Sequence, residues 1–113
     1  MELISLADFL QITTTTPTES EAQQIAAELI QQRFAACVQI EGPIASHYRW
    51  EGAVHCDSEF RLSIKTVAAR YPEVERLIQS LHSYQQPQII ALPIVAGTAG
   101  YLDWLTEQTR PIC

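Results

Sequence analysis

Apolar and polar residues alternate along the chain in two rhythms, one typical of strands and the other of helices. Residues 8–15 are rich in Phe, Leu, Ile and Thr and predict a strand that ends before Pro17. The pattern Thr18-x-x-Glu21 predicts a capping box, in which the Thr18 hydroxyl accepts from the Glu21 amide and the Glu21 carboxylate reaches back. Apolar residues then follow at helical spacing and predict a helix over 19–33: Ala22, Ile25, Ala26, Leu29 and Ile30.

A long hairpin is predicted in the middle of the chain. Its first strand covers 35–40, bends at Gly42-Pro43 and resumes over 45–50. Glu51-Gly52 supplies a tight turn, although a Glu at a positive φ would be strained. The return strand covers 53–65. Alternation in its second half predicts three side chains that point inward and four that point outward: Phe60, Leu62 and Ile64 inward; Glu59, Arg61, Ser63 and Lys65 outward.

The last third of the chain predicts a helix, a strand and a shorter helix. Pro72 suits a first helical position, and apolar residues follow it at helical spacing: Val74, Leu77, Ile78 and Leu81. Residues 89–95 form an apolar strand that Pro93 places at a sheet edge or strand end. Thr98 caps a short third helix that carries Tyr101 and Trp104.

This order of elements predicts one α+β domain over residues 1–113 with a ferredoxin-like, split βαβ fold. In that arrangement an antiparallel sheet carries two helices on one face. The other face has no helices of its own. Because the strands are apolar, we expect a second copy of the chain to cover that face.

Composition narrows the possible partners and compartments. The chain has 113 residues, of which 47% are hydrophobic and 18% charged, which is typical of a folded domain. A net charge of −6 argues against nucleic-acid binding, because phosphate backbones repel an acidic protein. No apolar run approaches the roughly 18 residues of a membrane span, and the first residues lack a basic signal region. Three cysteines without a Cys-x-x-Cys pair indicate reduced thiols, so we expect a cytoplasmic protein.

The segment 46–52 is the main candidate for chemistry. It places His47, Tyr48, Arg49 and Trp50 in four consecutive positions beside the hairpin turn. Exposed rings at a hairpin tip are usually covered by another subunit or by a ligand. Four aromatic residues therefore have two interpretations, interface packing or the walls of a small-molecule cleft: Tyr48, Trp50, Tyr84 and Trp104. Arg49 and Lys65 are candidates for ion pairs between subunits or for contacts to an anionic ligand.

Six short motifs occur in the order seen in the CutA family of divalent-cation tolerance proteins, which this chain resembles over residues 9–109. They are Arg33 to Val38, Tyr48 to Gly52, Ile64 to Thr66, His82 to Pro87, Ile90 to Ile94 and Tyr101 to Leu105. The resemblance implies a homotrimer similar to the PII signalling proteins, with hairpins that reach across neighbouring subunits. It also implies copper or another divalent cation as a ligand and no catalytic reaction.

From the residues and the resemblance together, we predict two groups of site residues. The first lines an inter-subunit cleft or interface: Tyr48, Arg49, Trp50, Lys65, Tyr84, Pro87 and Trp104. The second holds a metal ion: Cys37 and His82. The predicted function is a non-enzymatic trimer that binds a divalent cation or a small ligand between its subunits.

Several positions depart from the family pattern. Some bacterial members place a Cys after the first strand and a His pair before the Pro-Tyr motif, whereas this chain has Thr14 and Leu81-His82. Losing two soft ligands weakens the expectation of copper. Ser83, Gln88 and Ala96 stand where the family usually has Pro, Glu and an acidic residue.

Two other functions remain as alternatives. One is a structural trimer that binds another protein and no ligand. The other is a small enzyme of the acylphosphatase type, which needs a loop that cradles an anion after the first strand. Residues 13–20 contain neither Gly nor Arg, and no catalytic triad can be argued from spacing, so we predict no enzyme activity.

Overall fold

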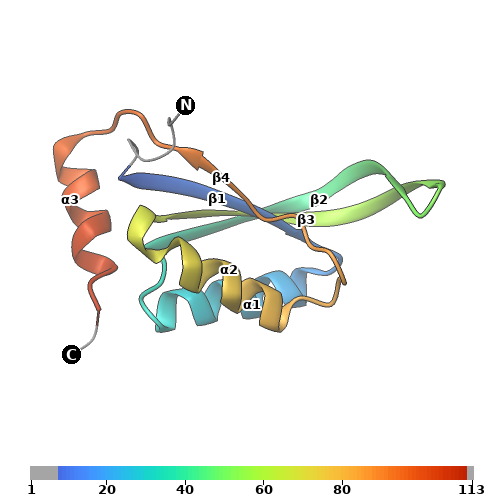
Figure 1. The fold of residues 1–113 in the computed structure, drawn as a ribbon, viewed down its shortest axis with the longest axis horizontal. Helices are drawn as coiled ribbons and strands as arrows, with labels where there is room; N and C mark the ends of the chain where they lie inside the picture. Colours follow the sequence, from blue (N-terminus) through green and yellow to red (C-terminus); the bar gives the residue numbers. More distant parts are fainter. Residues whose placement is uncertain (1–7, 112–113) are drawn as a thin grey trace.

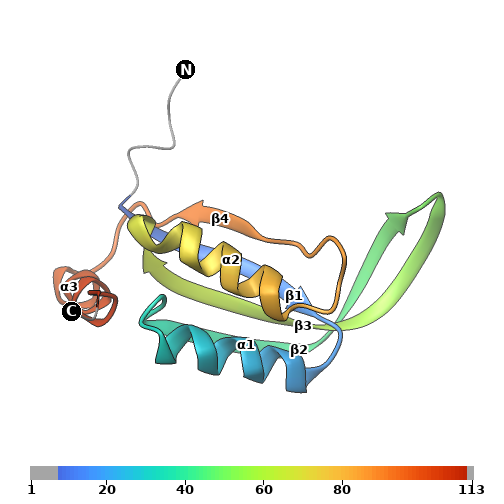
Figure 2. The ribbon, with the colours of Figure 1, turned by 60° about the horizontal axis from the view of Figure 1, so that its bottom comes forward.

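The computed structural model describes residues 8–111 and has the predicted fold class. Its elements are β1 (Phe9–Thr16), α1 (Glu19–Gln31), β2 (Cys37–Trp50), β3 (Ala53–Val67), the 3-10 turn η2 (Ala68–Arg70), α2 (Tyr71–Leu81), β4 (Ile90–Pro93) and α3 (Ala99–Gln108). The sheet order is β2-β3-β1-β4, and every neighbouring pair is antiparallel. Helices α1 and α2 lie side by side on one face of this sheet (Figures 1 and 2). The ferredoxin-like, split βαβ arrangement is therefore confirmed.

The core lies between that face and the two helices. Its fully buried residues come from every layer: Ile12, Ile25, Leu29, Leu62, Ile64, Val74 and Ile78. Each large apolar side chain removed from water contributes about 1.5–3 kcal/mol. The inward prediction for Leu62 and Ile64 is confirmed.

The uncovered face of the sheet is polar on its central strands, whereas apolar residues lie on it at the edge strand β4. Residues that pair directly across antiparallel strands share a face. The pairs on this side are Gln11 with Lys65, Thr13 with Ser63, and Glu41 with Arg61, whose side chains form an ion pair of 3.0 Å. Ile90 and Leu92 of β4 are on the same face, because they pair with Thr13 and Gln11, and both are about half exposed. Further exposed aromatic and apolar residues lie on the hairpin and on α3: Tyr48, Trp50, Val54, Tyr101 and Trp104.

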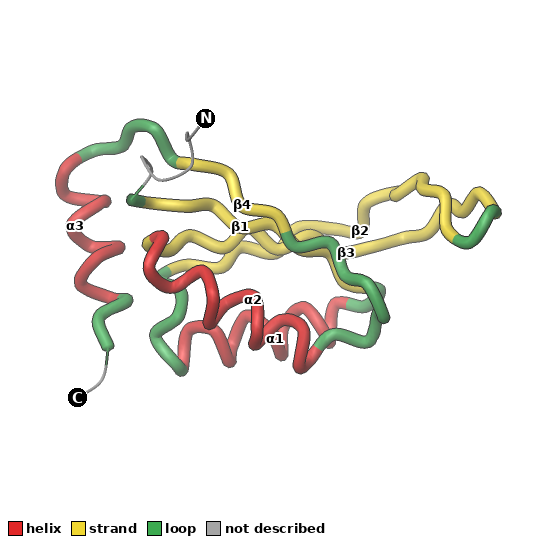
Figure 3. The backbone as a smooth tube through the Cα atoms, in the orientation of Figure 1, coloured by secondary structure: helices red, strands yellow, loops and turns green. Residues whose placement is uncertain are grey.

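The β2–β3 hairpin continues well beyond the rest of the sheet. Strand β1 pairs with β3 only as far as Thr16 opposite Phe60, and within residues 8–111 the hairpin pairs only with itself after that point. We call residues 44–59 the arm, and Figures 1 and 3 show it projecting from the body of the molecule. Glu51 and Gly52 turn the chain with φ values of 50° and 80°, the two positive angles of a type I′ turn. The predicted turn and its unfavourable Glu are both confirmed.

A bulge marks the root of the arm. Glu41 pairs with Arg61 and Ile44 pairs with Glu59, so two residues of β2 face a single residue of β3. The predicted bend at Gly42-Pro43 is this bulge, and the strand continues through it. A Cβ atom at Gly42 would lie 2.6 Å from the Phe60 ring, so glycine is required at this close approach.

Helix α3 packs at the end of the sheet opposite the arm (Figure 1). Two guanidinium groups bind the carbonyl groups at its C-terminal end. Arg33 donates to the carbonyls of Glu107 and Arg110 at 2.7 and 2.8 Å, and Arg70 donates to that of Thr109 at 2.9 Å. The last carbonyls of a helix lack the usual amide partner four residues on, so cationic donors stabilise this end.

The lengths of strand β4 and of the helices have further consequences. Strand β4 covers Ile90–Pro93 and is shorter than the predicted 89–95, although the Ile94 amide still donates to the Phe9 carbonyl at 2.9 Å. Among the helices of residues 8–111, none has the length and apolar character needed to cross a membrane.

Candidate functional site

A cleft of about 580 Å³ lies at the root of the arm. Three parts of the chain form it: the end of β1, the arm, and the loop from α2 to β4. Its lining residues are Thr15, Ser46, His47, Tyr48, Trp50, Glu59, Ser83, Tyr84, Gln85, Gln86 and Gln88. The cleft thus combines aromatic rings with hydroxyl, amide and carboxyl groups, as small-ligand sites usually do.

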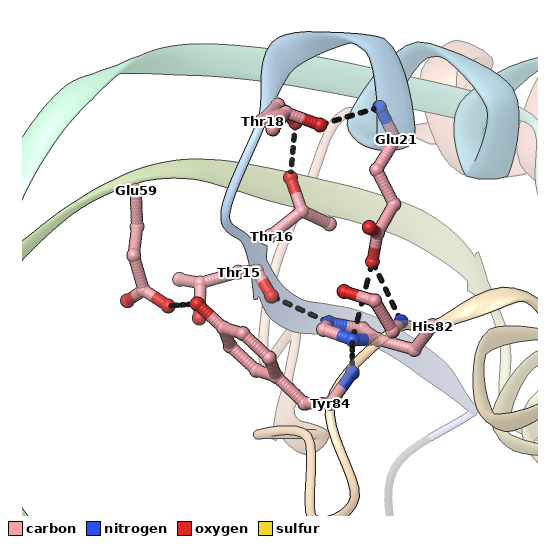
Figure 4. A network of polar contacts seen from close by, with 8 residues as sticks. Thr15, Thr16, Thr18, Glu21, Glu59, His82 and Tyr84 are labelled. Atoms are coloured by element: carbon pink, nitrogen blue, oxygen red, sulfur yellow. Dashed lines mark hydrogen bonds and ion pairs between the residues drawn. The ribbon is translucent and has the colours of Figure 1, made fainter.

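A buried carboxylate and a phenol meet in the cleft. The Tyr84 hydroxyl donates to Glu59 Oε2 at 2.8 Å, and Glu59 is only 6% exposed (Figure 4). Burial, followed by this hydrogen bond to Glu59, raises the pKa of Tyr84 strongly, so the phenol stays protonated and keeps donating. Alternation places Glu59 away from the helices, but the prediction that it points outward like Arg61 misses its burial.

His82 is fully buried and holds the cleft loop against β1. Its Nε2 donates to the Thr15 carbonyl at 2.7 Å, and its Nδ1 accepts from the Tyr84 amide at 3.0 Å (Figure 4). A nitrogen that accepts an N–H carries no proton, so these two contacts fit the tautomer protonated on Nε2. Neither ring nitrogen is free for a metal ion, which argues against the prediction of His82 as a metal ligand.

Glu21 connects α1 to the same loop. The Thr18 hydroxyl accepts from the Glu21 amide at 3.2 Å, as the capping pattern predicts. The Glu21 carboxylate, however, accepts from the Ser83 amide at 2.9 Å and lies 3.3 Å from His82 Nδ1. It therefore does not close the predicted capping box but fixes the start of the cleft loop.

The aromatic residues of the arm form the outer wall of the cleft. Tyr48 and Trp50 are 40% and 42% exposed, and the Tyr48 ring stacks on His55 with centroids 5.2 Å apart. The Tyr48 hydroxyl donates to Asp57, and this hydrogen bond is the main cause of the raised pKa of Tyr48. These rings remain available to a partner or a ligand.

Known proteins of similar sequence show the family to which this chain belongs. The sequence model described as "CutA1 divalent ion tolerance protein" matches residues 10–108. The chain belongs to the CutA1 family. The divalent-cation tolerance protein CutA of Thermus thermophilus is 44% identical over 95 residues, which are 84% of this chain and 92% of that protein.

Solved CutA structures share the fold closely. The divalent cation tolerance protein from Thermus thermophilus superposes with a TM-score of 0.88 at 41% identity, covering 90% of this chain and 99% of that one. The periplasmic divalent cation tolerance protein CutA from Archaeoglobus fulgidus gives 0.88 at 37% identity, covering 90% and 99%. These relatives support a role in divalent-cation tolerance for this CutA1 chain. Its compartment stays a prediction.

Of the residues predicted for the cleft of this CutA1 chain, the structure brings Tyr48, Trp50 and Tyr84 together. Pro87 lies in the cleft loop between the lining residues Gln86 and Gln88. Arg49 is exposed on the arm opposite Val54. Whether these residues bind a ligand stays a prediction.

Lys65 and Trp104 lie elsewhere within a single chain. Lys65 is opposite Cys37, at the end of the hairpin far from the turn, and donates to Gln39 at 2.5 Å. The twelve residue-to-residue steps from Ala53 to Lys65 span roughly 40 Å of strand, so within one chain Lys65 does not lie beside the aromatic cluster. Trp104 is on α3, with its ring centroid 5.7 Å from that of Tyr101.

The two predicted metal ligands do not meet in one chain either. Cys37 pairs with Lys65, whereas His82 binds Thr15, whose partner on β3 is Arg61. Lys65 and Arg61 are four residues apart on β3, which corresponds to roughly 13 Å. The structure shows no group of three or more His, Cys, Asp or Glu residues placed for a metal ion within residues 8–111.

The charge of the cleft favours a cation over an anion. Glu59 contributes a carboxylate to the lining, and Asp57 adds a second beside Tyr48. None of the described lining residues is Lys or Arg. Oxygen donors from carboxylates, hydroxyls and amides suit hard divalent cations, and aromatic faces attract positive charge.

Sequence reasoning missed one arrangement on the arm. His47 pairs with Cys56, and His55 pairs with Tyr48. A two-residue turn at positions 51 and 52 fixes this register. In every pair of the arm, the residue numbers of the two partners therefore add to 103. The turn alone could therefore have revealed the His47–Cys56 pair.

Proposed function

We propose that this chain is a non-enzymatic homotrimer that serves divalent-cation tolerance by binding a divalent cation in the cleft at the root of the arm. The observation that carries the proposal is the cleft itself, in which the buried carboxylate of Glu59 lies among hydroxyl and amide groups, with no Lys or Arg among the described lining residues. The family resemblance implies copper, but the donors that line this cleft suit harder divalent ions better.

The exposed apolar surface supports the assembly. One patch is on the arm, where Tyr48, Trp50 and Val54 are exposed, and another is on the edge strand β4, where Ile90 and Leu92 are about half exposed. Two different patches suit a head-to-tail contact, which forms a closed ring when the rotation between subunits allows it. Three subunits are the number that the resemblance implies.

The mass of the protein in solution tests the assembly. We expect light scattering at micromolar concentration to give the mass of three chains of 12.7 kDa, with and without a chelator. Leu92→Lys should dissociate the trimer, because a charge on the edge strand opposes pairing. Ile30→Lys, at an exposed position on α1, should leave it intact. A monomeric wild-type protein would contradict the proposal.

Calorimetric titration with Mn²⁺ tests the cleft. We expect saturable binding to the wild-type protein and a loss of affinity of about tenfold or more in Glu59→Gln, since a carboxylate ligand becomes a neutral amide. Glu41→Gln, in the ion pair with Arg61, is the matched control. A wild-type protein without saturable heat would disprove cation binding in the cleft.

A second candidate is a structural trimer that presents its arm or α3 to another protein. The exposed rings of Tyr101 and Trp104, at the end of the sheet far from the arm, favour this function. Recovery of one stoichiometric partner that is lost in Trp104→Ala and unaffected by chelator would support it. Failure of Trp104→Ala to change the recovered proteins would exclude binding through α3.

A further inference from the structure

A thiol and an imidazole lie next to each other on the arm. Cys56 Sγ and His47 Nε2 are 3.4 Å apart, and the two residues are directly opposite each other in the ladder. Both are exposed, so an ion in solution has access to them. Thiolate sulfur and imidazole nitrogen are the donors that thiophilic divalent cations such as Zn²⁺ prefer.

The spacing of these two atoms fits a tetrahedral ion. Zinc binds thiolate sulfur at about 2.3 Å and imidazole nitrogen at about 2.0–2.1 Å, so two tetrahedral positions place sulfur and nitrogen about 3.5 Å apart. The observed distance of 3.4 Å matches this value. An ion could therefore bind both atoms with little rearrangement of the arm.

We propose that Cys56 and His47 form a binding site for one thiophilic divalent cation on the arm. This inference deepens the proposed function, on which it rests, by assigning donors for a class of cation that the oxygen-lined cleft does not favour. On binding, the Cys56 thiol releases its proton to solvent and its sulfur bonds the ion, while neutral His47 coordinates through Nε2. Water fills the two remaining positions, and no electron is transferred.

The pair is on the side of the arm opposite Tyr48, and His47 is also a lining residue of the cleft. Alternation puts Tyr48, His55 and Asp57 on one side of the ribbon and the pair on the other. Arg49 shares the face of the pair, and its positive charge opposes cation binding. Two protein ligands give weaker binding than the three or four of most zinc sites, which suits an ion that is bound reversibly.

Zinc affinity measured by competition with a chromogenic chelator tests the inference. The parent is the 113-residue chain with Cys113→Ser, which removes the thiol outside the described residues. We expect one Zn²⁺ per chain and affinities at least about tenfold lower in Cys56→Ser and in His47→Asn, because each loses a direct ligand. Cys37→Ser, which alters the thiol at the other end of β2, should bind zinc like the parent.

Two further measurements sharpen this test. With Co²⁺ as the probe, a thiolate-to-metal charge-transfer band should appear in the parent and in Cys37→Ser but not in Cys56→Ser. Arg49→Gln should tighten zinc binding, since it removes the cation on the same face. Thermal unfolding in chelator should be the same for the parent and Cys56→Ser, which excludes misfolding as the cause of lost binding.

Parent-like zinc affinity in Cys56→Ser, or no zinc binding by the parent, would overturn the inference. The proposed function would then be judged separately, by Mn²⁺ titration of the parent and Glu59→Gln. If the parent binds Mn²⁺ but not Zn²⁺, the arm site is wrong and the cleft stands. If it binds Zn²⁺ through Cys56 but not Mn²⁺, the arm site stands and the cleft is wrong.

Discussion

The two halves of strand β3 have opposite surroundings although they belong to one continuous strand. In the body, Leu62 and Ile64 are fully buried between the sheet and the two helices. In the arm, Val54 is 68% exposed, and within residues 8–111 its strand has a partner on one side only. Burial of apolar surface is the main favourable term in folding, so the body stabilises the fold. The arm adds little to the fold, which leaves its side chains available for assembly and ligands.

The largest expected effect contrasts matched positions in these two halves. Ile64→Ala should lower the free energy of unfolding by about 2–5 kcal/mol, since it leaves a cavity in the core. Val54→Ala should change it by no more than about 0.5 kcal/mol. Urea unfolding monitored by circular dichroism measures both. A larger, concentration-dependent cost for Val54→Ala would show that assembly buries the arm and that the contrast holds only for a single chain.

The next effect is expected at the junction of body and arm. Tyr84→Phe should cost about 1–3 kcal/mol, because it leaves the buried Glu59 carboxylate without its donor. Tyr101→Phe changes a tyrosine at the opposite end of the molecule and should have little effect. Equal costs for the two variants in urea unfolding would mean that the Glu59–Tyr84 contact does not stabilise the junction.

The same pair predicts a dependence on pH. The pKa of Tyr84 is higher in the folded protein than the ordinary value of about 10. Its contribution to stability is therefore complete below about pH 10 and is lost as the pH rises further. The free energy of unfolding should fall less steeply in this alkaline range for Tyr84→Phe than for the wild-type protein. The slope should not vanish, since Tyr48, Tyr71 and Tyr101 also have raised pKa values. Unchanged slopes would contradict the role of Tyr84.

A moderate effect is expected where α1 begins. Thr18→Ala removes the hydroxyl that accepts from the Glu21 amide and should cost about 1 kcal/mol. Ser20→Ala, within the first turn of the same helix, is the control and should be close to neutral. Thermal unfolding can compare the two. A neutral Thr18→Ala would show that the network around Glu21 holds this end of the helix without the cap.

The smallest effect is expected at the tip of the arm. Glu51→Asn should raise the free energy of unfolding by about a few tenths of a kcal/mol, because Asn tolerates a positive φ better than Glu. Gly52→Ala should act in the opposite direction, since its φ of 80° disfavours a side chain although no atom lies within 4 Å. If both changes are destabilising, the Glu51 side chain has a role that the single chain does not reveal.

Much of the fold could be predicted from local sequence. The capping residue Thr18, the helical spacing after it and the turn at Glu51-Gly52 each depend on neighbouring residues, and each occurs where the sequence indicates. The burial of Glu59 could not be predicted, because it depends on Tyr84, which comes from the distant loop after α2. The destination of the Glu21 carboxylate was missed for the same reason, since the Ser83 amide is 62 residues away.

The candidate site was only partly accessible from sequence. Aromatic composition drew attention to Tyr48, Trp50 and Tyr84, which do share one cleft. The family motifs give no distances between residues. Lys65 and Trp104 were therefore grouped with residues that lie far from them in space within a single chain. The polar character of β3 on the uncovered sheet face could be predicted, because alternation puts Arg61, Ser63 and Lys65 there. Counting apolar residues over whole strands concealed that pattern.

The bulge at the root of the arm changes which residues of β2 point to each side of the sheet. Before it, odd-numbered residues such as Glu41 point to the helix-free side, whereas after it even-numbered ones such as Tyr48 and Trp50 do so. The tight turn determines which residues of the arm pair with each other. Deletion of Pro43 would therefore leave Tyr48 opposite His55. It would lose the local bend and extra twist that a bulge gives a strand. The ribbon would then leave the body at a new angle, and its rings would swing relative to the loop that completes the cleft.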